Sequence, residues 1–186
     1  MSKYPFTSKK EKFLWYCAFM VFIAIYSTLF IGRPLIDFFS NQNVQALIFM
    51  IGMMLAGSAI IVHGLRTNSG KLEWVIMLGL GSVFGMLLLR LGLAERSHLI
   101  EYSVLTVFIH QAIIERFQDK YYYFILAGVA FVIAFGIGVV DELIQILLPN
   151  RVFDGVDILF NGMAAAFAVG SYLILTWVRN YLKLKI

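Results

Sequence analysis

The chain has 186 residues and a formal net charge of +4, and 61% of its residues are hydrophobic while only 14% are charged. A soluble domain is usually about a quarter charged, and here the apolar residues form long runs with no polar stretch long enough to fold alone. We therefore expect an all-α protein, a polytopic transmembrane helix bundle of about six spans. The single cysteine, Cys17, excludes an intramolecular disulfide.

The N-terminal half predicts three membrane-spanning helices. Residues 1–12 form a basic N-terminal segment. No small-residue cleavage pattern follows the first apolar run, so we interpret that run as a retained helix and not as a signal peptide. Arg33-Pro34 is expected to end it, because proline disfavours helical conformation in the preceding residue. The predicted spans are 13–32, 44–63 and 74–94, which together form the region 13–94.

The C-terminal half predicts three further spans and a basic tail at 179–186. Ser97, with Glu101 nearby, is typical of a helix start and predicts the beginning of the fourth span. The connection 149–155 is so short that the fifth and sixth spans must be neighbours. The predicted spans are 97–114, 121–148 and 156–178, within the region 95–178.

The basic residues predict the orientation. With six spans, all fifteen Lys and Arg residues except Arg33, Arg90, Arg96 and Arg151 fall on one side of the membrane. The positive-inside rule makes that side cytoplasmic, so both termini are expected in the cytoplasm. The basic charge then reflects orientation and attraction to the anionic lipid bilayer, and no nucleic-acid partner is expected.

Polar residues gather at three helix ends, which this topology places at one depth on the outer face. At the start of the fourth span, His98, Glu101 and Tyr102 share one helix face. Charge inside hydrocarbon is expensive, so these groups must pair with one another or bind something. The polar residues of the fifth span, the sixth span and their connection are Asp141, Glu142, Gln145, Arg151, Asp154, Asp157 and Asn161.

The adjacent carboxylates of Asp141 and Glu142 are the strongest candidates for chemistry. Near the end of an apolar span they repel one another unless protons, a cation or arginines neutralise them. Buried pairs of this kind are typical of acid–base chemistry or proton movement. We therefore treat both residues as candidate catalytic groups, with His98 as a second proton carrier.

The other polar residues each have a structural and a functional interpretation. Asp154 either caps the sixth helix or belongs to a ligand site. Asp157 and Asn161 either bond neighbouring helices or line such a site. Arg151 is a solvated loop charge, a partner of Asp154, or an anchor for phosphate or carboxylate.

No metal ion and no cofactor is predicted. Several of the polar side chains are of types that bind zinc or manganese, but their spacing matches no signature such as a His-Glu-x-x-His helix. His63 and His110 fall toward the inner half and are more typical of packed or interfacial histidines. The side chains of ligand type are His98, Glu101, Asp141, Glu142 and Asp157.

Two polar blocks of this chain resemble the VanZ-like family. That family has a His-x-x-x-Tyr helix, then Asp-Glu-x-x-Gln, a proline, an arginine, Asp-x-x-Asp, and Asn followed by glycine. Here HLIEYSVL at 98–105 and DELIQILLPNRVFDGVDILFNGMAAAFA at 141–168 carry the pattern, and the resemblance covers about 95–170. The matching positions are His98, Tyr102, Asp141, Glu142, Gln145, Pro149, Arg151, Asp154, Asp157, Asn161 and Gly162.

The resemblance implies a small multi-pass protein of the bacterial plasma (inner) membrane with a VanZ-like domain at 95–178. The name-giving member of the family is associated with low-level resistance to the glycopeptide teicoplanin. The resemblance implies no biochemical mechanism, so whether the chain is an enzyme stays open.

Two hypotheses follow for this cell-envelope protein. In the first it is not an enzyme, and an outer-face polar pocket binds a lipid-linked, cell-wall or amphiphilic ligand. In the second it is an intramembrane enzyme that acts on a lipid or cell-wall precursor, with Asp141 and Glu142 as acid and base. A transporter is disfavoured, because the six spans show no evident repeat and the charges cluster at one face. The expected ligand-binding residues are Tyr102, Gln145, Arg151, Asp154, Asp157 and Asn161.

Overall fold

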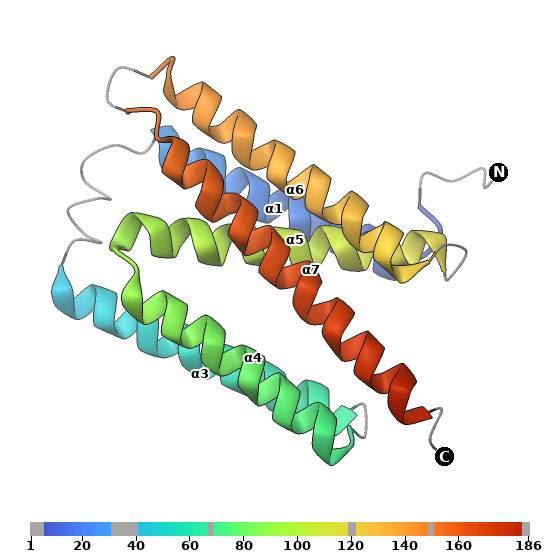
Figure 1. Ribbon diagram of the computed structural model, residues 1–186. Coiled ribbons are helices and arrows are strands. Elements are labelled where there is room, and N and C mark those ends of the chain that lie inside the picture. The colour runs from blue at the N-terminus through green and yellow to red at the C-terminus, as the bar shows by residue number, and fades with distance from the viewer. Residues whose placement is uncertain (1–5, 31–40, 67–68, 119–121, 149–150, 184–186) are drawn as a thin grey trace. The chain divides into compact units, whose positions relative to one another are not determined.

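The computed structural model describes residues 6–30, 41–66, 69–118, 122–148 and 151–183. These ranges contain six α-helices and no strand (Figure 1). The helices are α1 (Lys9–Phe30), α3 (Gln42–Arg66), α4 (Lys71–Arg90), α5 (Leu93–Phe117), α6 (Tyr123–Gln145) and α7 (Gly155–Lys183). The helix end predicted at Arg33-Pro34 lies outside the described residues.

The helices have the length and composition of membrane spans. Five of them, α1, α4, α5, α6 and α7, are long and apolar enough to cross a bilayer. Helix α3 has 25 residues, about 37 Å at 1.5 Å per residue, which exceeds the hydrocarbon thickness of a bilayer. The predicted all-α class with about six spans is thus confirmed, and the chain is an integral, multi-pass membrane protein.

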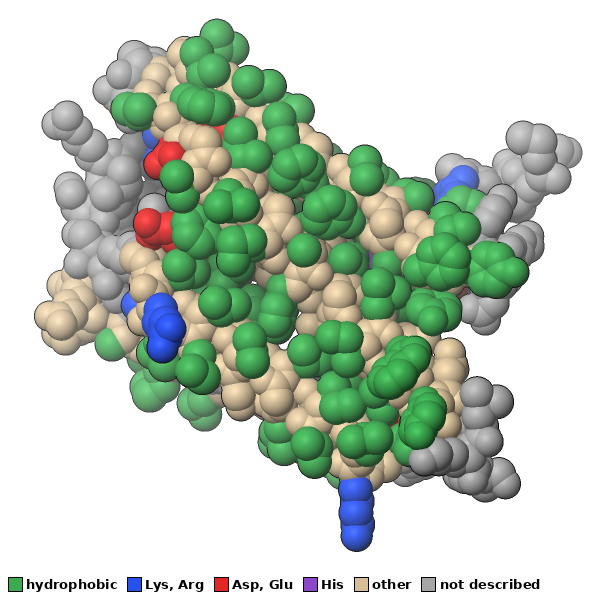
Figure 2. All heavy atoms as spheres, viewed as in Figure 1, with side chains coloured by type: hydrophobic (Ala, Val, Ile, Leu, Met, Phe, Trp, Pro, Cys, Tyr) green, Lys and Arg blue, Asp and Glu red, His purple; other side chains and the backbone are tan. Residues whose placement is uncertain are grey.

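The outer surface of the helices is largely hydrocarbon. Large side chains such as Phe19, Met20, Leu89 and Val132 are exposed. Hydrophobic side chains cover most of the face shown in Figure 2, where charged side chains are few. An apolar surface of this extent is unfavourable in water, whereas in a bilayer it contacts lipid.

The described residues divide into two compact units. The first unit contains the described residues of 6–30 and 92–173. The second contains the described residues of 41–91 and 174–183. Helix α1 therefore belongs with the helices that carry the two polar blocks. Helix α7 contributes its first part to one unit and its last part to the other.

Helix α5 is the centre of the first unit, where it packs against both α1 and α6. In the apolar segment of α5, 44% of the residues are buried, against 11% in that of α1 and 28% in that of α6. Because its buried side chains recur every three or four residues, they form one continuous stripe along the helix. The largest of them are Leu99, Tyr102, Leu105, Ile109 and Ile113.

Helix α5 begins at Leu93, so the predicted start at Ser97 is wrong. Gly92 has extended backbone angles before the helix, and its carbonyl accepts a hydrogen bond from the Arg96 N–H at 3.1 Å. Ser97 therefore lies inside the helix. This extra turn places His98 within regular helix, where residues four positions apart project from the same face.

Helix α1 begins before its apolar run because polar residues cap it. The Glu11 N–H donates to the Ser8 hydroxyl at 2.9 Å, while the Glu11 carboxylate accepts from the Thr7 N–H at 2.6 Å. Arg116 at the end of α5 donates to the same carboxylate at 2.9 Å. A capping arrangement of this kind satisfies free N–H groups of the first turn. It also ties the start of α1 to α5.

The second unit contains α3, α4 and the end of α7. Helices α3 and α4 pack together, and a Cβ on Gly64 would overlap the Trp74 indole, so glycine permits that approach. Helix α4 starts three residues before the predicted span and thereby includes Glu73. The Arg179 guanidinium donates to both Glu73 oxygens, at 3.4 and 3.3 Å.

Candidate functional site

The connection between α6 and α7 positions the start of α7. Helix α6 ends at Gln145, and α7 begins at Gly155. The Asp154 carboxylate accepts a hydrogen bond from the Val156 N–H at 2.8 Å, which confirms the capping interpretation of this aspartate. Pro149, which the resemblance includes, lies outside the described residues.

Gly138 allows α5, α6 and α7 to meet closely. A Cβ at this position would lie 2.8 Å from Cβ of Asn161 and 3.1 Å from Cε1 of Tyr102. The same buried face of α6 carries Ala130 and Ala134, and small residues at this spacing let helix backbones approach in a membrane. Helices α6 and α7 are therefore neighbours, as predicted. The small residues Ala130, Ala134 and Gly138 recur every four positions, and this spacing is the sequence signal from which the close contact at Gly138 could have been predicted.

His98 connects α5 to α7. Its Nδ1 atom lies 2.9 Å from Oδ1 of Asn161, and its Nε2 atom lies 3.4 Å from Oδ2 of Asp157. Asp157 and Asn161 are four residues apart and project from one face of α7. The fourth and the last span are thus in contact, a question that the sequence by itself left open. The side chains of His98 and Asp157 are 14% and 18% exposed and form the accessible edge of the cluster.

Asp141 and Glu142 are both buried although they are adjacent in sequence, with 1% and 0% exposure. The Tyr102 hydroxyl donates to Oδ2 of Asp141 at 3.1 Å. The side-chain amide of Gln145 donates to Oε1 of Glu142 at 2.7 Å, and the backbone N–H of Asp154 donates to Oε2 at 3.2 Å. Each carboxylate is therefore held in place by another residue of the predicted set.

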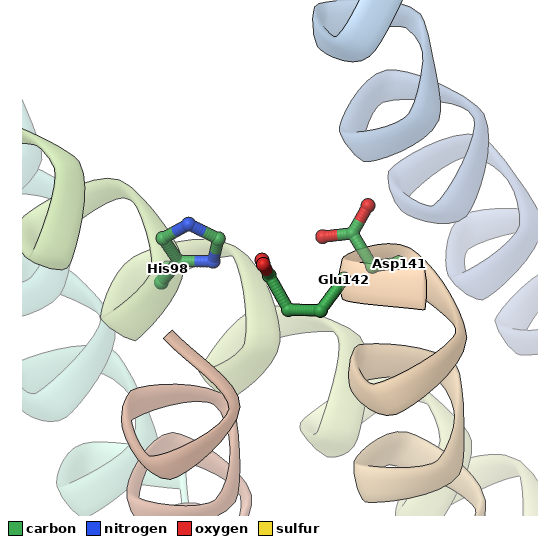
Figure 3. A group of neighbouring side chains, drawn as sticks. All are labelled: His98, Asp141 and Glu142. Carbon is green, nitrogen blue, oxygen red and sulfur yellow. The ribbon is translucent and has the colours of Figure 1, made fainter. Parts of the chain in front are cut away.

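His98, Asp141 and Glu142 converge. Each offers an atom of metal-ligand type, and these atoms all lie within 4.8 Å of one another. Figure 3 shows the Glu142 carboxylate directed toward the His98 imidazole, with the Asp141 carboxylate beside it at the end of α6. Such an arrangement can pass a proton between carboxyl and imidazole groups, or it can hold a cation between them. We call His98, Asp141, Glu142, Asp157 and Asn161 the polar cluster.

Arg151 does not pair with the acids of the polar cluster. Among the described residues, no lysine or arginine forms an ion pair with Asp141, Glu142 or Asp157. The Arg151 guanidinium instead donates to the backbone oxygen of Thr28 on α1 at 2.7 Å. It is thus bonded to α1 and not to Asp154.

Helix α1 supports the polar cluster through two contacts that sequence analysis did not identify. One is the Arg151 bond to the Thr28 carbonyl. The other is a hydrogen bond from the Tyr26 hydroxyl to the carbonyl oxygen of Ile137, at 3.2 Å. Both acceptors are backbone carbonyls, which carry no residue-specific signal in the sequence.

The remaining candidates are His63, His110 and Glu101, of which Glu101 lies close enough to His98 and Asp141 to interact with them electrostatically. Glu101 is half-buried and has no hydrogen bond or ion pair with any other described residue. His110 is buried and meets the Tyr172 ring edge-on at 4.4 Å between ring centroids, so it is a packed histidine, as predicted. The side chain of His63 lies outside the described part of the chain.

Comparison with protein-family models, with curated proteins and with solved structures gives no match to this chain.

Proposed function

We propose that this chain is a VanZ-like protein of the bacterial plasma membrane, with both termini in the cytoplasm. In this proposal the polar cluster is an outer-face pocket for a lipid-linked or cell-wall ligand. The observation that carries the proposal is that residues of both sequence blocks meet. His98 and Tyr102 of the first block contact Asn161 and Asp141 of the second, at 2.9 and 3.1 Å.

The surroundings of the polar cluster favour an amphiphilic ligand. The end of α6 that carries the two carboxylates also exposes the apolar side chains of Val140 and Leu143, and Leu147, just after the helix, is exposed as well. A lipid-linked ligand can place its polar head at the accessible edge, formed by His98 and Asp157, and its chain along hydrocarbon. Aligned polar groups beside an apolar surface are typical of small-molecule sites.

We further propose that binding at this site lowers susceptibility to teicoplanin. The test compares susceptibility of a bacterial strain that produces the wild type, Glu142→Asp or Glu142→Gln, with protein level measured in each. A binding role predicts that Glu142→Asp keeps much of the effect, because the carboxylate is retained. Reporter fusions to both termini test the orientation, and an external terminus contradicts it.

Direct binding is tested with a photoactivatable lipid-linked cell-wall precursor in membranes. Cross-linking should map to α5, α6 and α7 near the polar cluster and should fall in a His98→Ala variant. Equal labelling of wild type and variant contradicts a ligand site at the cluster. His110→Ala is the matched control, because that histidine lies outside the cluster.

A second candidate function is an intramembrane enzyme that acts on a lipid or cell-wall precursor. It is favoured by the His98 imidazole, which lies within reach of both carboxylates. Glu142→Gln removes the ionisable group while preserving shape, so an acid–base mechanism predicts complete loss of function at unchanged protein level and topology. Full function of that variant contradicts the mechanism.

A further inference from the structure

The polar cluster contains buried polar atoms without partners. Oδ1 of Asp141 and Nδ2 of Asn161 have no hydrogen-bond partner among the described residues, although these side chains are 1% and 0% exposed. A buried carboxylate oxygen without a partner is costly, because the desolvation of that atom is not compensated. Such an atom in a cluster of ligand-type groups indicates a missing partner.

The charge of the polar cluster points to the kind of partner. Asp141, Glu142 and Asp157 bring three carboxylates together, and the only basic group that contacts them within the described residues is the His98 ring, 3.4 Å from Asp157. Carboxylates in a low-dielectric environment repel strongly unless a cation or protons neutralise them. Hydrogen bonds from Tyr102 and Gln145 orient the carboxylates but supply no charge.

We propose that His98, Asp141 and Glu142 bind a divalent transition-metal cation, of which Zn²⁺ and Mn²⁺ are the best matches. One imidazole nitrogen and two carboxylate oxygens form a mixed donor set that suits these ions, whereas Mg²⁺ and Ca²⁺ prefer oxygen alone. A tetrahedral ion with bonds of about 2.1 Å separates its ligand atoms by roughly 3.4 Å. The three groups, which lie within 4.8 Å of one another, reach that spacing by a small side-chain movement.

The neighbours of these three residues match those of a metal site. Metal-bound histidines usually have their second ring nitrogen held by a carboxylate or carbonyl. Whichever His98 nitrogen binds the cation, the other has such a partner, Asp157 or Asn161. Both Glu142 oxygens accept one hydrogen bond each, from Gln145 and from Asp154, which fixes the carboxylate and leaves lone pairs for a cation.

This inference does not rest on the proposed function, because metal binding is measured without any lipid ligand. The full chain, purified in detergent without a histidine tag, is stripped with a chelator and then exposed to ZnCl₂ or MnCl₂. Bound metal is counted by elemental analysis, and affinity is measured by titration calorimetry. We expect one ion per chain and a higher thermal unfolding midpoint with metal, since a ligand of the folded state stabilises it.

The variants separate this site from adventitious binding. His98→Gln and Glu142→Gln should each weaken the affinity at least about tenfold, the scale expected even for loss of a residue that only orients a metal ligand. Glu115→Gln is the matched control and should bind as the wild type does, because Glu115 lies at the opposite end of α5 from His98 and pairs with Lys10. If Glu142→Gln does not fold, His98→Gln decides the result.

Two outcomes overturn the proposal. In the first, the wild type retains no metal and its unfolding midpoint does not change, so protons neutralise the acids. In the second, His98→Gln and Glu115→Gln bind metal equally well, so the ion lies elsewhere. A flat calorimetric response to CaCl₂, with a clear response to ZnCl₂ or MnCl₂, supports the nitrogen-containing donor set.

Discussion

The Nδ1 atom of His98 on α5 lies 2.9 Å from Oδ1 of Asn161 on α7, and this contact links the two sequence blocks. It is a polar contact between helices in a membrane protein, where no gain in hydrophobic burial drives helix association. The contact also fixes the ring of His98, which lies within 4.8 Å of both buried carboxylates. Stability and the geometry of the site therefore depend on the same pair of residues.

We expect the effects of His98→Ala and Asn161→Ala on stability to be coupled. Since each substitution removes the same contact, the double variant should be less destabilised than the sum of the single variants. The interaction free energy should be about 0.6 kcal/mol, with roughly 1.7 kcal/mol as an upper value. Equilibrium unfolding in detergent micelles measures it. Additive effects contradict the contact, and a cycle of Asn161→Ala with His110→Ala is the non-contacting control.

Gly138→Ala should destabilise the first unit by about 1–3 kcal/mol, because the added methyl group overpacks the contact with Asn161. Its Cβ would lie 2.8 Å from Cβ of that residue. The matched control is Gly136→Ala on the same helix, where a Cβ would meet nothing within 4 Å. Thermal unfolding in detergent compares the two variants. Equal midpoints would show that α6 and α7 do not approach closely at Gly138.

Glu11→Ala should destabilise the chain by about 1–3 kcal/mol, since Arg116 and Thr7 lose their acceptor and α1 loses part of its cap. The control is Glu115→Ala. That residue pairs with Lys10, whose side chain is 68% exposed, and an exposed pair contributes about 0–1 kcal/mol. Unfolding midpoints of both variants are measured under one set of conditions. If Glu115→Ala lowers the unfolding midpoint more than Glu11→Ala does, the buried Glu11 carboxylate does not have the importance that we assign to it.

Arg151→Ala should loosen the end of α1. The variant removes the 2.7 Å hydrogen bond to the Thr28 carbonyl, and loss of a charge-assisted bond at a half-buried site lowers the local opening free energy by about 1–1.5 kcal/mol. Hydrogen–deuterium exchange of peptides around Thr28 should accelerate by roughly tenfold. Arg90→Ala, at an exposed arginine in the second unit, should leave these peptides unchanged. Unchanged exchange in Arg151→Ala would mean that this bond does not hold α1.

The sequence predicted the helices well, because long apolar runs are set by the thickness of the bilayer. It predicted their ends less well. Helix α5 begins at Leu93 and not at Ser97, because the extended backbone of Gly92 marks the start more strongly than a serine with a nearby glutamate. Helix α1 begins at Lys9 because Ser8 and Glu11 cap it, a local signal that hydropathy does not register.

Amino-acid composition and helical periodicity by themselves determined that this is an all-α membrane protein with polar residues at one end of three helices. The tertiary structure alone decided which of those residues meet. It brought His98, Asp141 and Glu142 within 4.8 Å, directed Arg151 to α1, and left Glu101 without a hydrogen bond to any described residue of the cluster. The physical reason is that periodicity fixes the face on which a side chain lies, whereas contact depends on helix packing. Here close packing depends on Gly138, whose missing side chain lets α6 approach α5 and α7.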